Sequence, residues 1–223
     1  MITYTKTKKL DINFDGMDEQ MKKMIPQSES LEMELTFIKE QSLFQNKKGE
    51  SLEDLDMESD DGSMKITFIR EDQVENILHK NLDRNIRTHQ KGIMGKPFLI
   101  VDDLKNLQWK ITSEKVKYLG YECQKAVIEN EDEFVVAWYT PSIPVQHGPS
   151  SYYGLPGLIL MLSINDGDTE FKANAVELME LGELQVKAPN KGKKVNQVQY
   201  DKIETDKINE LKEMYSKKKS KNK

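Results

Sequence analysis

Apolar and polar residues alternate with a period of two in several segments, and this pattern most constrains how the chain can fold. In residues 31–37, Leu, Met, Leu and Phe alternate with Glu, Glu and Thr. Such alternation turns one set of side chains toward a buried face and the other toward water. It predicts half-buried antiparallel strands here and in the similar segments 2–5, 64–68, 107–111 and 121–128.

The segment 134–139 (FVVAWY) is apolar at both parities rather than at alternate positions. A strand covered on both faces has this composition, so we expect it in the middle of the sheet. Further along, Asn165-Asp166-Gly167-Asp168 separates two strand-like runs, 158–164 and 169–176. Asp-Gly tolerates the positive φ angles of a tight turn, which predicts a hairpin.

The end of the chain has a different period. Apolar residues follow helical spacing at Tyr200, Ile203, Ile208, Leu211 and Tyr215. This spacing predicts one amphipathic helix at about residues 197–215. Residues 216–223 (SKKKSKNK) contain five lysines and nothing apolar, so we expect a disordered tail.

The predicted fold is therefore mainly β (α+β), as one antiparallel β domain over residues 1–215. We expect a single curved antiparallel sheet or half-barrel with a C-terminal amphipathic helix. Residues 49–61 hold seven acids and no base, which predicts a solvated acidic loop. A short helix near residues 18–25 would place Met17, Met21 and Met24 on one face.

Charge and composition exclude several classes of protein. The 223 residues carry 33 basic and 38 acidic side chains, a formal net charge of −5, which argues against a nucleic-acid partner. No apolar run reaches the roughly 18 residues of a transmembrane helix. The single cysteine, Cys123, excludes an internal disulfide and a paired-cysteine metal or redox motif. The start of the chain lacks the features of a secretory signal, so the protein is either cytoplasmic or has lost its signal.

One ordered string of residues resembles a known family. AWYT at 137–140 is followed by Ile-Pro at 143–144, Gly-Pro at 148–149 and GLPGLIL at 154–160. Together with 109–112 (WKIT), 120–126 (GYECQKA) and the early 42–44 (SLF), this resembles the GLPGLI family of Bacteroidetes. Residues 129–133 (ENEDE) depart from it, because members commonly carry a Gly-Arg pair before the Ala-Trp-Tyr strand.

The resemblance implies a location more than an activity. Members of the family are usually exported with an N-terminal signal that is cleaved, so the chain resembles a mature form in the periplasm or associated with the outer membrane. The family has no established activity, so the resemblance assigns no catalytic residue.

The candidate binding residues lie in and beside the loop 141–157, which is rich in Pro, Gly, Ser and Tyr. Aromatic side chains offer a large contact area with a polar tip, and Tyr152-Tyr153 is the better candidate for a contact. The alternative is that Gly and Pro only form a tight entry into a buried strand, with Trp138 in the core. The candidates are Trp138, Tyr139, His147, Tyr152, Tyr153, Gly154, Leu155, Pro156 and Gly157.

Catalytic and metal sites have weaker support. Cys123 and His147 would need to lie within hydrogen-bond reach of each other to act as nucleophile and base, and no local motif indicates this. A lone cysteine on a strand is usually a small buried hydrophobic residue. His79 and His89 lack the spacing of metal ligands, so we predict no catalytic residue, no metal and no cofactor.

The leading hypothesis is a non-enzymatic envelope binding or accessory protein, for an apolar ligand or an outer-membrane partner. An apolar-ligand carrier predicts a closed apolar cavity of several hundred Å³. The alternative, a structural subunit of an outer-membrane assembly, predicts an exposed apolar patch around Tyr152. A hydrolase, the third hypothesis, predicts an accessible Cys123 close to His147.

Overall fold

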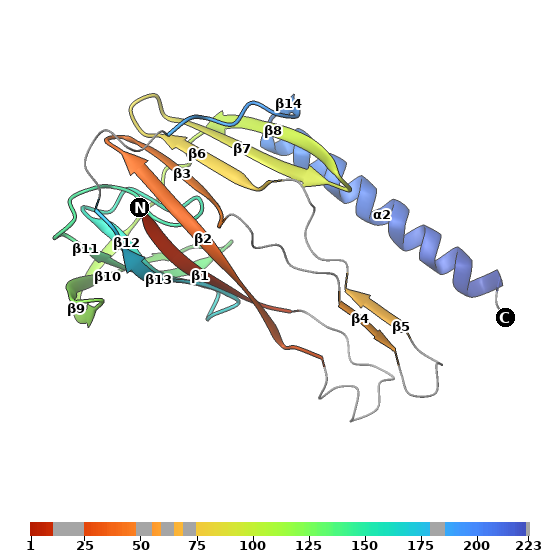
Figure 1. The fold of residues 1–223 in the computed structure, drawn as a ribbon, viewed down its shortest axis with the longest axis horizontal. Helices are drawn as coiled ribbons and strands as arrows, with labels where there is room; N and C mark the ends of the chain where they lie inside the picture. Colours follow the sequence, from red (N-terminus) through yellow and green to blue (C-terminus); the bar gives the residue numbers. More distant parts are fainter. Residues whose placement is uncertain (11–24, 48–54, 59–64, 69–74, 179–185, 222–223) are drawn as a thin grey trace.

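The computed structural model describes residues 1–10, 25–47, 55–58, 65–68, 75–178 and 186–221. Within these ranges, fourteen strands and one helix are present (Figure 1). They are β1 (Ile2–Lys9), β2 (Ser28–Ile38), β3 (Gln41–Asn46), β4 (Leu55–Glu58), β5 (Lys65–Phe68), β6 (Ile77–Asn81), β7 (Ile86–Ile93), β8 (Lys96–Asp103), β9 (Lys110–Tyr118), β10 (Tyr121–Glu129), β11 (Phe134–Thr140), β12 (Leu158–Ile164), β13 (Thr169–Val176), β14 (Lys193–Val195) and α2 (Gln197–Lys221).

Twelve of the described strands form one open sheet in the order β14-β8-β7-β6-β3-β2-β1-β13-β12-β11-β10-β9. It consists of two antiparallel meanders that meet where β1 pairs with β13. The short β14 adds to the edge in parallel with β8. The prediction of a mainly β, curved antiparallel sheet with a C-terminal helix is confirmed.

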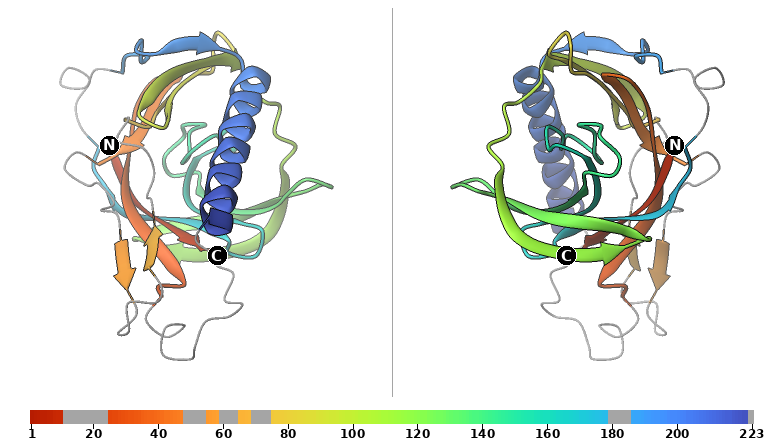
Figure 2. Two further views of the ribbon diagram at one scale, coloured as in Figure 1. Left: turned by 90° about the vertical axis from the view of Figure 1, so that its right-hand side faces the viewer. Right: turned by 90° about the vertical axis from the view of Figure 1, so that its left-hand side faces the viewer.

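The sheet curls around the loop 141–157, which leaves β11 and returns to β12 (Figure 2). Residues 104–109 connect β8 near one edge of the sheet to β9 at the other. The loop lies inside the curve, so apolar residues of the sheet and of the loop share one core. That core includes Ile2, Tyr4, Leu35 and Ala137 from the strands and Ile143, Tyr152 and Leu155 from the loop.

The alternating pattern of residues 31–37 predicted β2 correctly. Leu31, Met33 and Leu35 are buried, and Phe37 packs against the core from a partly buried position. In β1, Ile2 and Tyr4 are fully buried, as the alternation of 2–5 predicts. The hairpin at 165–168 is confirmed, because the residues between β12 and β13 include Asn165, Asp166 and Gly167 with φ of 48°, 54° and 86°.

Two strand predictions were wrong in part. Residues 107–109 lie outside β9, which begins at Lys110, and Ile111 is exposed. In β10 the buried residues occupy both parities, Cys123 at one and Ala126 and Ile128 at the other, and the pairing with β9 shifts by two residues between Gln124 and Ala126. The extra residues of this shift are in β9, whereas the register of β10 with β11 is unbroken.

The segment 134–139 forms β11 inside the sheet, between β10 and β12. It is not covered on both faces as we predicted. Val135, Ala137 and Tyr139 are buried, whereas Val136 and Trp138 are only half-buried and Phe134 is exposed. The outer face of β11 is therefore apolar in sequence but is only partly buried.

The helix α2 begins at Gln197 as predicted but continues to Lys221, so residues 216–221 are helical rather than a disordered tail. Its first turns hold it to the sheet. Tyr200 is 1% exposed, packs edge-on against Phe98 at 5.7 Å between ring centroids, and donates a hydrogen bond to the carbonyl of Gly92. Ile208, by contrast, is 46% exposed.

Two predictions fall wholly or partly on residues outside the described ranges. Residues 55–58 of the predicted acidic loop form β4, which pairs with β5 in a separate two-stranded sheet, and the rest of 49–61 lies outside. Nearly all of the predicted short helix at 18–25 also lies outside. Among the described residues, no helix combines the length and hydropathy needed to cross a membrane.

Candidate functional site

The loop 141–157, here called the plug loop, enters and leaves the sheet through a close backbone approach. Gly157 follows the exposed Pro156 and lies directly against the end of β11. A Cβ atom on Gly157 would lie 2.2 Å from the carbonyl oxygen of Thr140. Glycine is therefore required here for packing, which supports the structural interpretation of the Gly-Pro pattern.

Lys80 holds the plug loop from the opposite wall of the curved sheet. It lies on β6, is fully buried, and its Nζ donates to three carbonyl oxygens of the loop. These belong to Gly148 at 2.9 Å, Ser150 at 2.6 Å and Tyr152 at 3.1 Å. Burial lowers the pKa of Lys80 to about 7, yet three acceptors match the three N–H bonds of an ammonium group. The buried lysine thus satisfies backbone groups that an irregular buried segment would otherwise leave unpaired.

His147 makes a second attachment of the plug loop. It is fully buried, and its Nε2 lies 2.8 Å from the carbonyl oxygen of Lys39, in the turn between β2 and β3. Its ring faces Phe37 at 5.6 Å between centroids. Burial is the main reason that the pKa of His147 falls to about 4, so the ring is neutral at pH 7. A neutral ring donating to a carbonyl has a structural role.

The two neighbouring tyrosines, predicted as an exposed contact, are both used inside the molecule. Tyr152 is 7% exposed and its hydroxyl donates to Glu133 Oε2 at 2.8 Å. Burial and the nearby carboxylate raise the pKa of Tyr152. Tyr153 is half-buried, its hydroxyl donates to the carbonyl of Lys105, and its own carbonyl accepts from Trp109 Nε1 at 2.8 Å. Tyr152 itself therefore offers almost no exposed surface for a contact.

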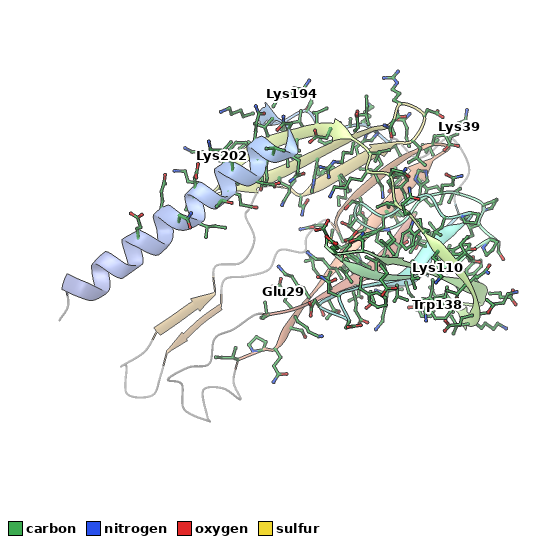
Figure 3. The ribbon with its side chains drawn as sticks, turned by 180° about the vertical axis from the view of Figure 1, so that it is seen from behind. Glu29, Lys39, Lys110, Trp138, Lys194 and Lys202 are labelled. Carbon is green, nitrogen blue, oxygen red and sulfur yellow. The ribbon has the colours of Figure 1, made fainter. Side chains whose placement is uncertain are left out.

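The remaining predicted binding residues are dispersed. Tyr139 is 2% exposed and its hydroxyl donates to Gln124. Trp138 lies on the opposite face of β11, with Lys125 Nζ 6.0 Å from its ring, at the same end of the sheet as Lys110 (Figure 3). Leu155 is buried in the core, and Gly154 adopts a φ of +90°. The predicted set therefore does not converge on one surface.

Cys123 does not meet the condition for a nucleophile. It is fully buried, and burial raises the pKa of its thiol to about 11, which keeps it protonated. Its Sγ lies 3.8 Å from the carbonyl oxygen of Tyr121. His147, the proposed base, already uses Nε2 on Lys39.

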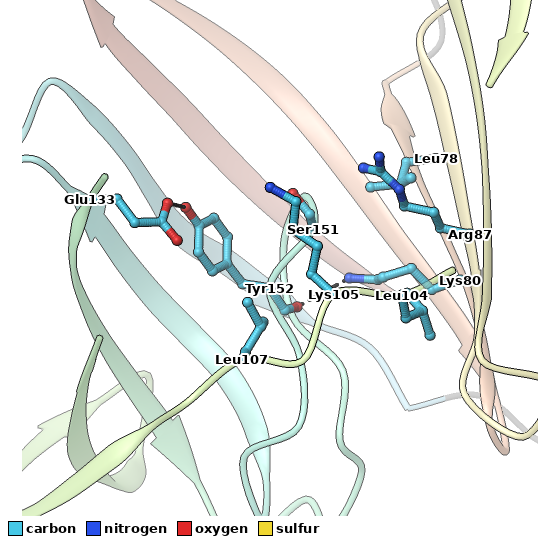
Figure 4. Close-up of a pocket in the computed structure, with 9 residues that line it drawn as sticks. All are labelled: Leu78, Lys80, Arg87, Leu104, Lys105, Leu107, Glu133, Ser151 and Tyr152. Carbon is cyan, nitrogen blue, oxygen red and sulfur yellow. Dashed lines mark hydrogen bonds between the residues drawn. The ribbon is translucent and has the colours of Figure 1, made fainter. Parts of the chain in front are cut away.

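A small pocket of about 80 Å³ opens beside the plug loop (Figure 4). Its wall combines β6, β7, the connection 104–109 and the turn before β11. The lining residues are Leu78, Lys80, Arg87, Leu104, Lys105, Leu107, Glu133, Ser151 and Tyr152. Of the predicted binding residues, only Tyr152 lines this pocket.

Sequence reasoning did not select the basic residues of the pocket. Lys80 and Arg87 pair directly across β6 and β7, so their side chains share the concave face. In the sequence, Lys80 and Arg87 each resemble a solvent-facing polar residue of an alternating strand. Lys105 lies in an irregular connection. Only the position of the plug loop against β6 distinguishes them, and that contact joins residues about 70 positions apart in sequence. Among the described residues, no cluster of three or more His, Cys, Asp or Glu side chains has the arrangement of a metal site.

The plug loop also lies within a match to a family model. That family is described as a protein of unknown function (Porph_ging), and the match covers residues 128–161, from the end of β10 into β12. This segment is similar to the Porph_ging family. No curated protein matches the chain.

Two solved structures of PNGF-II, in space groups P21 and C2, resemble the fold. Each aligns over 91% of this chain with a TM-score of 0.55, at 18% and 17% sequence identity. At this identity the similarity concerns the fold alone. The chain spans 32% of the length of those proteins, so the same architecture occurs there as one part of a longer chain.

Proposed function

We propose that this chain is a non-enzymatic binding or accessory protein of the bacterial envelope, whose recognition site is the pocket beside the plug loop. The observation that carries the proposal is the attachment of the plug loop inside the curved sheet by Lys80. Because the loop fills the concave side, the pocket at its rim is where a ligand would meet several polar groups.

The pocket favours a small polar ligand over the apolar ligand expected from half-barrel carriers. Ligand cavities for molecules of drug or lipid size span roughly 300–1,000 Å³. The pocket here is about 80 Å³ and is lined by Lys80, Arg87, Lys105 and Glu133 as well as by leucines. It offers room for a small molecule, or for one group of a larger partner.

An accessory role is also consistent with the state of Cys123 and His147, the two residues considered for catalysis. The thiol of Cys123 is buried and protonated, and His147 is committed to the carbonyl of Lys39. The comparable architecture in PNGF-II is one part of a longer protein, which supports a domain that assists another activity.

Membership of the GLPGLI family, and with it export and a cleaved signal, is part of this proposal. The match to Porph_ging over residues 128–161 supports a family of unknown function and does not reach that finer name. Fractionation of the cells that encode the protein tests the location. Recovery with periplasm or outer membrane supports the proposal, and recovery in the cytoplasm contradicts it.

Native mass spectrometry of protein purified gently from the envelope tests the function. We expect a bound small molecule or partner that is lost from the Arg87→Gln variant and kept by Lys117→Gln, a change on the exposed strand β9. The proposal is contradicted if the protein purified from the envelope carries no ligand or partner, or if both variants retain the ligand equally.

A structural subunit of an outer-membrane assembly is the second candidate. One observation favours it, with the contact at the edge strand β9 instead of at Tyr152. Among the described strands, the edge strand β9 pairs with β10 alone, and it exposes Ile111 (46%) and Val116 (39%). An unpaired strand edge is a template for another chain. Photocrosslinking from position 117 to an outer-membrane protein would support this candidate, and crosslinking from position 105 in the pocket would support the first.

A further inference from the structure

The pocket beside the plug loop is lined by two basic residues that lie directly opposite each other on neighbouring strands. Lys80 on β6 is the register partner of Arg87 on β7, and both line the same cavity (Figure 4). Like charges directly opposite on neighbouring strands are destabilising unless something neutralises them. The groups around Lys80 and Arg87 therefore show whether their positive charges are neutralised within the protein.

Among the described residues, no carboxylate forms an ion pair or hydrogen bond with Lys80. Its three hydrogen bonds go to backbone carbonyls, which stabilise a donor without cancelling its charge. Arg87 has one carboxylate nearby, Asp102 Oδ2 at 3.9 Å from Nη2. That same oxygen accepts a hydrogen bond of 2.6 Å from the backbone N–H of Gln197 at the start of α2. Asp102 is thus shared between Arg87 and the helix.

Arg87 also has an unused donor. Its side chain is 12% exposed, and its Nη2 donates to Gln197 Oε1 at 2.7 Å. Its Nε is buried and has no hydrogen-bond partner within the part of the chain that the structure describes. The guanidinium that lines the pocket is therefore incompletely neutralised by its described partners.

The rest of the lining adds one more cation and one carboxylate that is already occupied. Lys105 brings a third positive charge from the connection 104–109. Glu133 is the acidic residue of the lining, and its Oε2 accepts from the Tyr152 hydroxyl. The apolar side chains of Leu78, Leu104 and Leu107 complete the wall.

We infer that the pocket binds a small monocarboxylate with a short apolar substituent. The carboxylate lies against the positive charges of Arg87 and Lys105, the Ser151 hydroxyl lies on the same lining, and the substituent packs against the leucines. Hydrogen bonds between ionised groups are roughly twice as strong as neutral ones, which gives this class of ligand its advantage. The inference rests on the proposed function, because it names the ligand of that site.

Titration with isobutyrate, followed by NMR of the full chain, tests the inference against the neutral isostere isobutyramide. We expect saturable shifts for amides of residues 78–80, 87, 105 and 151–152, with isobutyramide about 10-fold weaker or worse. Equal binding of the two probes, or isobutyrate shifts spread over surface lysines without saturation, overturns the inference.

Variants assign the shifts to the pocket. Lys105→Gln changes an exposed side chain and leaves the core intact, and we expect about 10-fold weaker isobutyrate binding. Arg87→Gln should remove binding, with its thermal melt recorded to show that it folds. Lys117→Gln on β9 is the matched control and should bind like the parent. Unchanged binding by Lys105→Gln and a folded Arg87→Gln contradicts the inference.

The two proposals fail in different ways. If native mass spectrometry finds a neutral ligand or a protein that Arg87→Gln releases, while isobutyrate does not bind, the proposed function stands and the anionic ligand is wrong. If isobutyrate saturates the pocket but the protein from the envelope carries nothing, the site is real and the envelope function is wrong.

Discussion

The plug loop and the edge strand β9 reverse the usual relation between regular structure and burial. The plug loop is irregular, yet Ile143, His147, Tyr152 and Leu155 in it are buried. β9 is a regular nine-residue strand, yet nearly every one of its residues is exposed. Loops normally lie on the surface because their backbone polar groups need water.

The difference lies in how each segment satisfies its backbone. The plug loop is held by the buried Lys80 of β6, by its own His147, which donates to the Lys39 carbonyl, and by the close approach of its Gly157 to Thr140. β9 has the ladder to β10 on one side, and its charged side chains point to solvent. Stability therefore depends on single residues in the plug loop and is distributed over many weak contacts in β9.

Gly157→Ala should produce the largest effect. The added Cβ would lie 2.2 Å from the Thr140 oxygen and 2.6 Å from its carbonyl carbon, and both are backbone atoms that cannot rotate away. We expect a loss of about 5 kcal/mol in the free energy of unfolding, comparable to the total stability of many domains. Urea denaturation measures it.

The control for Gly157→Ala is Gly120→Ala, in the turn between β9 and β10. Gly120 has a φ of +84° and nothing within 4 Å of an added Cβ, so the cost is backbone strain of about 1 kcal/mol. Equal losses from the two variants would show that the plug loop moves aside and is not tightly held.

Lys80→Met should follow, with a loss of about 4 kcal/mol, because it leaves three plug-loop carbonyls without a donor. Lys117→Met on β9 should change stability by less than about 0.5 kcal/mol. Comparison of the two by urea denaturation at pH 7 shows whether the anchor is local. If Lys80→Met is as stable as the parent, the plug loop does not need its lysine.

The pH dependence of the free energy of unfolding, compared between the parent and Lys80→Met by urea denaturation, tests the charge of Lys80. Burial lowers the pKa of Lys80 from 10.5 to about 7. Between these values the unfolded chain binds the additional proton, so the parent gains stability as pH rises from about 7 toward 10. We expect Lys80→Met to lack this rise.

Acidification should weaken the plug loop through His147. Its pKa is lowered from 6.5 to about 4, so the unfolded state binds more protons between these values and stability falls as pH decreases from about 6.5 to 4. The loss is on the order of 3 kcal/mol. His147→Gln should remove that part of the loss in urea denaturation at pH 7 and pH 4.5.

His89 on β7 is the control for this pH effect, because burial also lowers its pKa, to about 3. At pH 4.5 we expect the plug-loop signals in NMR spectra of His89→Gln to weaken as they do in the parent. His147→Gln should retain these signals at the same pH. If the plug loop and β9 lose order together in the parent, the acid effect is global rather than local.

Sequence patterns predicted the parts of this fold that depend on neighbours along the chain. The alternation in 31–37 and the Asp-Gly turn at 165–168 are local signals, and both are confirmed. The burial of β10 at both parities was missed because it depends on contacts with other parts of the fold, which alternation along one strand cannot show. The end of α2 was placed early because its last six residues have little to bury.

The site was the least predictable part, for a physical reason. The Gly and Pro residues of the plug loop were assigned correctly to turn formation, but the tyrosines were expected to face solvent. Their burial depends on Lys80, Lys105 and Glu133, which are distant in sequence and ordinary in type. A charged residue on a strand predicts an exposed face, so the buried anchor carries no local signal.

The smallest contrast compares two polar contacts, one in each region. Tyr153→Phe removes the hydroxyl that donates to the Lys105 carbonyl, and we expect a loss of about 1 kcal/mol by urea denaturation. Glu114→Gln removes the exposed partner of Lys125, whose Nζ lies 2.9 Å and 3.1 Å from the two carboxylate oxygens. Exposed ion pairs are screened by water and salt, so this loss should stay below about 0.5 kcal/mol and vanish at high salt. A larger loss from Glu114→Gln than from Tyr153→Phe would mean that charges, and not the backbone ladder, hold β9 in register.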